Sequence, residues 1–267
     1  MTVAARATHV PTSSFTLTFP RQLRSEYIKL TTVRGTWWSV AIVAALTMGI
    51  AFLATLTMTA PADTIMAVVM PVQFTMMLAG ILGVISVTGE YSTGMIRSTL
   101  TANPVRGSVL AAKATVLAFF MFVVSLLIFL ATAAMISPLA ASSGIPLLWD
   151  DPGKTILPIL AASGAMALFA LLGVGLGFLL RSGAGAIAMT VGILFVLPII
   201  VALLGSFAQD IEWIGNLGNY LPASAAQNAI LPQDGWGLSA PEAWATLIAW
   251  PAAALLGAWA VVRGRDV

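Results

Sequence analysis

The sequence offers few side chains that could perform acid–base, nucleophilic or metal chemistry. It contains no Cys and a single His, His9, which leaves no disulfide framework, no thiol nucleophile and no Cys/His metal cluster. Asp and Glu are scarce as well, and none joins His9 in a cluster that could form a catalytic site. We therefore expect that the chain is not an enzyme and that it binds no cofactor and no metal.

Two stretches that contain glycine imitate nucleotide-binding motifs. Gly153-Lys154-Thr155 matches the end of a phosphate-binding loop, but Leu148 stands where the first Gly of that loop belongs. Gly173-Val174-Gly175-Leu176-Gly177 is followed by Leu179, where the Gly spacing would have to continue. Neither is a nucleotide site. Gly173 and Gly177 form a GxxxG pair, which favours close helix approach, either inside the chain or at a dimer face.

The most distinctive polar residues lie between 89 and 113. They read Gly89-Glu90-Tyr91-Ser92-Thr93-Gly94-Met95-Ile96-Arg97-Ser98-Thr99-Leu100, then Asn103-Pro104-Val105-Arg106 and Lys113. Glu90 and Arg97 are seven residues apart and would share one face of a continuous helix, where they could bind charged groups of a partner. Alternatively, both residues only anchor the end of an apolar segment at a membrane interface.

These residues are flanked by segments typical of a membrane protein. Of 267 residues, 59% are hydrophobic and only 8% are charged, whereas about 25% are charged in an ordinary soluble domain. A membrane-spanning helix needs about 20 apolar residues. The sequence predicts an all-α membrane protein with six such helices, at Trp37–Met58, Thr64–Val87, Ala114–Ile136, Thr155–Leu180, Ala184–Gly205 and Ala243–Val262.

The chain before the first span divides into two parts. Residues 1–18 are rich in Thr, Ser and Ala and predict a disordered cytoplasmic tail. Residues 19–36 predict an amphipathic interfacial helix with Pro20 in its first turn and Gly35 as its stop. This helix would lie on the membrane surface before Trp37 and Trp38. A solvated basic linker is the alternative. Residues 37–267 then form the transmembrane domain, with a cytoplasmic loop at 88–106.

The charges predict the orientation of the chain. An even number of spans places both termini on one side, and that side carries all of the 12 basic residues except Lys154. Seven acids lie on the opposite side: Asp63, Asp150, Asp151, Asp210, Glu212, Asp234 and Glu242. By the positive-inside rule, both termini are cytoplasmic. The net charge of +2 is too small to predict binding to nucleic acid.

Capping residues predict where several helices begin. Asn103-Pro104 would start the third span, Asp151-Pro152 the fourth, and Ser239-Ala240-Pro241-Glu242 would form a capping box at the sixth. The outer segment 206–240 holds Trp213, Tyr220 and Trp236 among Pro and Gly residues, which predicts short interfacial helices and no folded domain.

The predicted spans contain no ionisable side chain; their most polar residues include Gln73, Ser125, Thr132, Ser163 and Thr190. Ion-coupled carriers usually keep ionisable groups at membrane depth, so this pattern favours an energy source outside the chain. A secondary carrier, a channel, or a membrane anchor or sensor for another complex are the alternatives.

The segment from Gly89 to Lys113 resembles the first cytoplasmic loop of the ABC-2 type permeases, especially the short six-helix bacterial kind. In that family a Glu closes the second helix, a Gly follows it, and a short coupling helix precedes a Pro and basic residues. The order of elements along the whole chain is similar as well. The detailed resemblance covers only the loop.

The resemblance implies a permease subunit that exports a hydrophobic or amphipathic substrate across the bacterial cytoplasmic (inner) membrane. Glu90, Tyr91, Gly94 and Arg97 would couple it to cytoplasmic ABC ATPase subunits, which would bind ATP and Mg²⁺. A second permease copy, identical or similar, would complete a pathway between the two. Gln73, Thr75 and Thr132 are the candidate pathway residues, because polar groups at membrane depth usually face protein or water.

Overall fold

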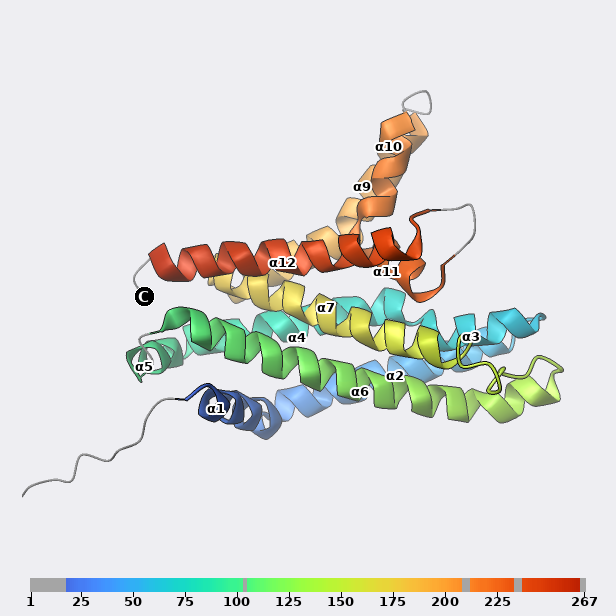
Figure 1. Ribbon diagram of the computed structural model, residues 1–267, viewed down its shortest axis with the longest axis horizontal. Coiled ribbons are helices and arrows are strands. Elements are labelled where there is room, and N and C mark those ends of the chain that lie inside the picture. Colours follow the sequence, from blue (N-terminus) through green and yellow to red (C-terminus); the bar gives the residue numbers. More distant parts are fainter. Residues whose placement is uncertain (1–17, 103–104, 208–211, 233–236, 265–267) are drawn as a thin grey trace, which may run out of the picture.

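The computed structural model describes residues 18–102, 105–207, 212–232 and 237–264, and every regular element in these ranges is a helix. The predicted disordered tail, apart from Thr18, lies outside the described residues. Most helices run along the long axis of one bundle, with α1 and α5 lying across one end of it (Figure 1). We call this the basic end of the bundle.

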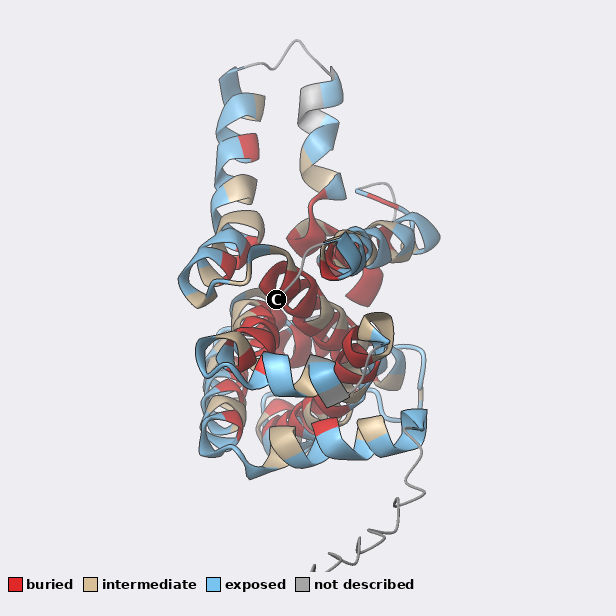
Figure 2. Ribbon diagram, turned by 90° about the vertical axis from the view of Figure 1, so that its left-hand side faces the viewer, coloured by how far each residue is buried: buried red, intermediate tan, exposed pale blue. Residues whose placement is uncertain are grey.

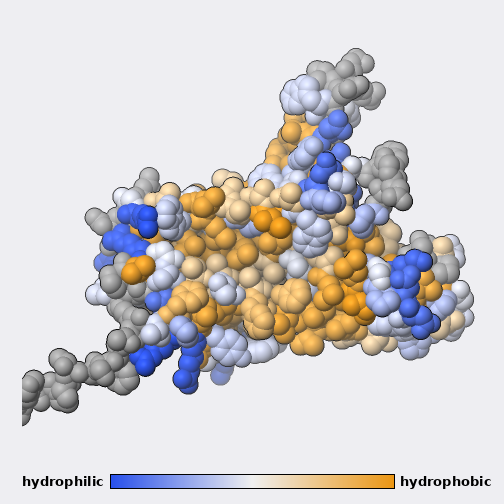
Figure 3. Space-filling view, viewed as in Figure 1, coloured by the Kyte–Doolittle hydropathy of each residue, from blue (hydrophilic) through white to orange (hydrophobic). Residues whose placement is uncertain are grey.

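Within the described residues, six helices are long and apolar enough to cross a membrane, which agrees with the predicted number of spans and with a multi-pass membrane protein. They cover Arg34–Thr55, Thr64–Ser92, Arg106–Ser142, Ile156–Leu180, Gly183–Phe207 and Ala240–Gly264. Hydrophilic residues gather at the two ends of the bundle, and a hydrophobic belt lies between them (Figure 3). Such a belt is what the hydrocarbon core of a bilayer requires.

The predicted amphipathic helix is present as α1, Phe19–Thr32, with Pro20 in its first turn. Val33 is extended and separates α1 from α2, Arg34–Thr55. The prediction that Gly35 stops the first helix is therefore wrong, because Gly35 lies in the first turn of the second helix. Both helices contact α6, Arg106–Ser142.

The second span is divided into α3, Pro61–Val69, and α4, Val72–Ser92. Pro71 lies at the break, and its missing N–H and bulky ring interrupt helical hydrogen bonding there. By contrast, α6 runs for 37 residues without interruption. It begins eight residues before the predicted span, and includes Lys113.

The centre of the bundle is α7, Ile156–Leu180, which packs against α4, α6 and α12, Ala240–Gly264. Most of α7 is buried, as the red ribbon at the centre of Figure 2 shows. A side chain on Gly173 would collide with the carbonyl oxygen of Gly80 on α4, and a Cβ on Gly177 would lie 3.0 Å from that of Val87. The GxxxG pair therefore serves an internal helix contact.

The fifth span bends in its middle. It consists of α8, Gly183–Val191, a π-helical turn η1, Gly192–Val196, and α9, Leu197–Phe207. Pro198 follows the π turn, and because it lacks an N–H it prevents regular helical bonding at this point. Beyond the bend, α9 leaves the bundle and pairs with α10, Glu212–Leu217, in an arm that projects from its side (Figures 1 and 2).

Short helices also form the rest of the predicted outer segment. A 3-10 turn η2, Gly218–Tyr220, leads into α11, Pro222–Ile230. Of these short helices, α11 packs against α7 and α12 and buries Ala225 completely, a contact that the prediction did not include.

The predicted helix starts have different outcomes. One half of the predicted capping box at α12 is present, since the Glu242 carboxylate accepts hydrogen bonds from Ser239 N at 3.0 Å and Ser239 Oγ at 2.7 Å. Asp151-Pro152 does not cap the fourth span; both residues lie in a turn before α7, whose cap residue is Thr155. Asn103-Pro104 lies outside the described residues.

Candidate functional site

The predicted coupling loop is a helix–turn–helix corner at the basic end of the bundle. Helix α4 ends at Ser92, and α5 covers Met95–Ala102. Between them Gly94 adopts φ +71°, a left-handed conformation that favours glycine. Glu90 and Arg97 therefore belong to different helices, and the expectation that they share one helical face is wrong.

Helix α5 has a buried side and an exposed side. Ile96 is 3% exposed and joins the hydrophobic core, whereas Arg97 and Ser98 are exposed. The helix contacts both α4 and α6, the helices that precede and follow it in the chain. It is thus a short helix held at both ends by membrane spans, with a cationic side chain directed outward.

Glu90, by contrast, is turned into the bundle. Its side chain is 7% exposed, and its Oε1 lies 2.8 Å from Lys113 Nζ on α6 and 3.0 Å from Lys29 Nζ on α1. Glu26 of α1 completes the group, with Oε2 at 2.6 Å from Lys113 Nζ and Oε1 at 2.7 Å from Lys29 Nζ. We call Glu26, Lys29, Glu90 and Lys113 the four-charge cluster.

The four-charge cluster fixes the amphipathic helix to the end of the bundle. Burial by itself raises the pKa of Glu26, but the attraction and hydrogen bonds of Lys113 and Lys29 outweigh burial and lower that pKa below its ordinary value. Burial likewise opposes the charge of Lys29, yet its bonds to Glu26 and Glu90 raise its pKa. The cluster has two positive and two negative charges and is neutral overall.

Sequence reasoning missed Glu26 as a member of this site. A signal was nevertheless present, since Glu26 follows Leu23 by three residues and precedes Leu30 by four, which places an acid on the apolar face of the helix. A charge on that face needs a partner when the helix docks. The partner, Lys113, is 87 residues away in the chain, so the spacing of residues did not reveal it.

Tyr91 links α4 to the turn between the fourth and fifth spans. Its ring meets the ring of Phe178 edge to face, with centroids 6.3 Å apart, and the Arg181 guanidinium lies over it at 5.8 Å. Arg181 also donates from Nη2 to the carbonyl oxygen of Val261 on α12 at 3.3 Å. Tyr91 therefore packs at the inner side of the corner, and Arg181 is a structural residue of the bundle.

Two of the three candidate pathway residues are packed inside the bundle. Thr75 and Thr132 are completely buried. Thr75 Oγ1 donates to the carbonyl oxygen of Pro71 at 3.0 Å, and Thr132 Oγ1 to that of Ile128 at 2.7 Å. Each hydroxyl is thus satisfied by its own helix.

The third pathway candidate, Gln73, lines a cavity of about 450 Å³ near the break between α3 and α4. Asn219, Gln227 and Asn228, which come from η2 and α11, face the same cavity. Sequence reasoning did not connect these residues with Gln73, because it predicted short interfacial helices in the outer segment without assigning them packing partners. The buried position of α11 brings the polar groups together.

The described residues contain no group of three or more His, Asp or Glu side chains that could hold a metal ion. The helices, the hydrophobic belt and the charged corner define an α-helical, multi-pass membrane protein. No model of a known protein family matches the chain, and no curated protein matches it. The case for a function therefore rests on the residues and their geometry.

Proposed function

We propose that this chain is the membrane-spanning permease subunit of an ATP-binding cassette transporter of the ABC-2 type. In this proposal it exports a hydrophobic or amphipathic substrate across a bacterial cytoplasmic membrane, with both termini in the cytoplasm. Cytoplasmic ABC ATPase subunits hydrolyse ATP, and a second permease copy completes the pathway. The chain itself has no enzymatic activity and binds no cofactor.

The observation that carries the proposal is the placement of α5. A cytoplasmic motor can move a membrane domain only through an element that projects from it and is rigidly joined to the spans. Helix α5 contacts α4 and α6, is seated by Ile96, and exposes Arg97. Gly94 allows the sharp turn that places it across the end of the bundle.

In this proposal the predicted coupling residues have separate roles, which the four-charge cluster supports. Arg97, on the exposed side of α5, contacts the ATPase in this proposal. Glu90 and Tyr91 instead join α4 to α1, α6 and the α7–α8 turn, so that movement of the corner is transmitted to the spans. The pathway includes Gln73 and the polar cavity that it shares with α11.

A secondary carrier is the second candidate, because Glu90 and Lys113 are ionisable groups within the observed spanning helices, which extend beyond the predicted spans. Ionisable groups of this kind can form proton relays. The cluster nevertheless lies at one end of the bundle and is neutral overall, which favours a structural role over a transport role.

Site-directed crosslinking tests the proposal directly. Because the chain has no Cys, Ser98→Cys introduces a unique thiol on the exposed side of α5. In membranes of the native host, a Cys-to-Lys crosslinker should join this thiol to a protein whose sequence identifies it as an ABC ATPase. The matched control is Thr57→Cys, an exposed position beyond the opposite end of α2. Equal crosslinking of both positions, or no ATPase at Ser98→Cys, would contradict the proposal.

A further inference from the structure

Helix α1 is described over its whole length, and the side that points away from the bundle carries arginine and apolar side chains but no acid. Arg21 and Arg24 are exposed there, and Tyr27 and Ile28 are 55% and 48% exposed. Residues 21, 24 and 28 follow one another at spacings of three and four, so they share one side of the helix. Glu26, the single acid of α1, is buried on the opposite side. We call the exposed side the outward face of α1.

The acids described at the basic end do not offset these arginines. Glu26 and Glu90 are buried in the four-charge cluster, where Lys29 and Lys113 already neutralise them. Arg34, at the joint between α1 and α2, is exposed and adds a further cation. Within the described part of the chain, the outward face of α1 and this joint therefore expose an excess of positive charge.

Two tryptophans support a position of this face at the membrane surface. Trp38, near the start of α2, is 71% exposed, and Trp37 beside it donates from Nε1 to the carbonyl oxygen of Thr31 at 2.8 Å. Tryptophan side chains at the end of a span are typical of the headgroup level. Helix α1 lies along the edge of the basic end, whereas α5 lies nearer its middle (Figures 1 and 2). The outward face of α1 is therefore turned toward the surrounding headgroups.

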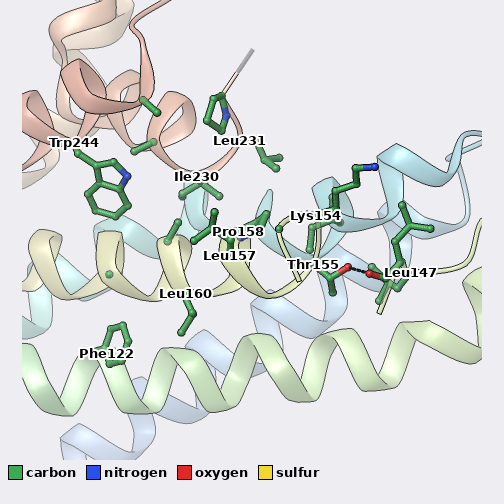
Figure 4. A pocket seen from close by; sticks show the side chains of 18 residues that line it. Phe122, Leu147, Lys154, Thr155, Leu157, Pro158, Leu160, Ile230, Leu231 and Trp244 are labelled. Carbon is green, nitrogen blue, oxygen red and sulfur yellow. Dashed lines mark hydrogen bonds between the residues drawn. The ribbon is translucent and has the colours of Figure 1, made fainter. Parts of the chain in front are cut away.

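The opposite end of the bundle provides a contrast. An apolar groove of about 740 Å³ lies there, with Lys154 toward one end of it (Figure 4). Asp151 Oδ2 lies 3.3 Å from Lys154 Nζ, and Asp150 is exposed beside this pair. Because the acids outnumber the cation at this place, its charge does not favour an anion. The two ends of the molecule thus differ in the headgroup charge that they favour.

We propose that the outward face of α1 and Arg34 bind the headgroups of anionic phospholipids, with Arg24 and Arg34 in contact with their phosphates. A guanidinium can bind phosphate oxygens in a bidentate manner, while Tyr27 and Ile28 enter the boundary between headgroups and acyl chains. An interfacial position alone does not require this preference, because a neutral headgroup would accept the apolar side chains equally well. The lipids hold α1 from outside and the four-charge cluster holds it from inside. This surface does not depend on the proposed transport function.

Fluorescence quenching tests this surface in the full-length protein, purified and reconstituted in phosphatidylcholine bilayers. Because the chain has no Cys, Thr32→Cys gives a unique thiol at an exposed position of α1 for a bimane fluorophore. The quencher is either phosphatidylglycerol or phosphatidylcholine, each with a nitroxide near the glycerol end of one acyl chain. At equal amounts, the anionic phosphatidylglycerol should quench more strongly, because it is enriched around α1. Bimane at Thr57→Cys, beyond the opposite end of α2, should show no such preference.

Three substitutions separate a local site from the general charge of the basic end. Arg24→Gln and Arg34→Gln should each reduce the enrichment of phosphatidylglycerol about fivefold, the factor that one cation near a bilayer surface contributes. Arg97→Gln removes an exposed cation of α5 and should change the enrichment much less. None of these arginines belongs to the four-charge cluster, so the helix content and thermal stability should remain those of the parent protein. Higher ionic strength should weaken the preference, because salt screens exposed charges.

Equal quenching by the two lipids in the Thr32→Cys protein would overturn the proposal. So would a preference that survives the combined Arg24→Gln and Arg34→Gln substitutions, or one that Arg97→Gln reduces just as strongly. A protein partner is the competing occupant of this face. If the chain is reconstituted together with the proteins that copurify with it, loss of quenching by both lipids would show that a protein covers α1, and lipid binding there would be refuted.

Discussion

At the residue scale, the main result is that Glu90 is buried and forms ion pairs with Lys29 and Lys113 within the chain. A buried ion pair contributes little net stability when it is complete, but removing one partner leaves an uncompensated charge and costs about 3–5 kcal/mol. Lys113 is 6% exposed and binds both Glu90 and Glu26. Substitutions at Glu90 should therefore lower the free energy of unfolding.

A double-mutant cycle measures this effect. Glu90→Gln and Lys113→Met should each lower the thermal stability of the detergent-solubilised protein, by about 3 kcal/mol in free energy of unfolding. The double variant should lose less than the sum of the two, because neither charge is then left alone. Arg97→Ala serves as the control, since exposed charges contribute little to stability. Strict additivity at Glu90 and Lys113 would show that the pair is not coupled.

The lowered pKa of Glu26 and the raised pKa of Lys29 predict how the docking of α1 depends on pH. A carboxyl with a lowered pKa stabilises the folded state above its ordinary value of 4.5, and that stabilisation is lost as the pH falls below it toward the folded pKa. The raised pKa of Lys29 gives stability below 10.5 that is lost at higher pH. Docking should thus be strongest between these limits.

Spin labels at Ser25 on α1 and Ala111 on α6, both exposed, can report this docking. The distance distribution measured by electron resonance should be narrow at pH 7 and should broaden on acidification well below pH 4.5, while the helix content remains constant. Glu26→Gln should broaden it at pH 7 already. A distribution that does not change with pH or with this substitution would show that the cluster does not hold α1.

At the scale of elements, the apolar segments predicted the helices well. Phe19, Leu23, Tyr27 and Leu30 predicted α1 to within a few residues of its observed bounds, and each apolar stretch became a span. Hydropathy depends on local composition, so it could not predict tertiary partners such as Glu26 and Lys113. It also missed the bend at η1 and the burial of α11, because both depend on what packs beside the helix.

The turn at Gly94 illustrates the same limit, because hydropathy does not predict its left-handed backbone conformation. A Cβ at Gly94 would meet no atom within 4 Å, so a substitution acts through the backbone alone. Its φ of +71° costs an ordinary residue about 1–2 kcal/mol, while Asn tolerates it better.

Gly94→Val should therefore destabilise the corner and reduce crosslinking from Ser98→Cys to the ATPase, whereas Gly94→Asn should retain most of both. Thermal stability and crosslinking yield measure the two effects. If Gly94→Val and Gly94→Asn had the same thermal stability and the same crosslinking yield, the left-handed turn would not be what positions α5.

At the scale of the whole molecule, the distribution of charge sets the proposed orientation. The described basic residues of the α1 and α5 end include Arg21, Arg24, Arg34, Arg97 and Arg263, whereas Lys154 lies at the opposite end. The positive-inside rule counts Lys and Arg residues in short loops, because loops that carry them tend to stay on the cytoplasmic side of the membrane. In the proposed orientation α5 lies in the cytoplasm, where an ATPase could reach it, and the arm of α9 and α10 lies toward the outer half.

Cysteine labelling can test this orientation with little background, because the chain has no Cys of its own. In intact cells, a membrane-impermeant thiol reagent should label Thr57→Cys, beyond the outer end of α2, and should label Ser98→Cys on α5 only after the membrane is permeabilised. Both positions are exposed, so a difference between them reports the side of the membrane and not burial. Because six spans place both termini with α5, Ser14→Cys should behave like Ser98→Cys. Labelling of Ser98→Cys in intact cells would show that the topology is the reverse of the proposed one. Helix α5 would then lie where no ATPase can reach it, and the proposed coupling would be refuted as well.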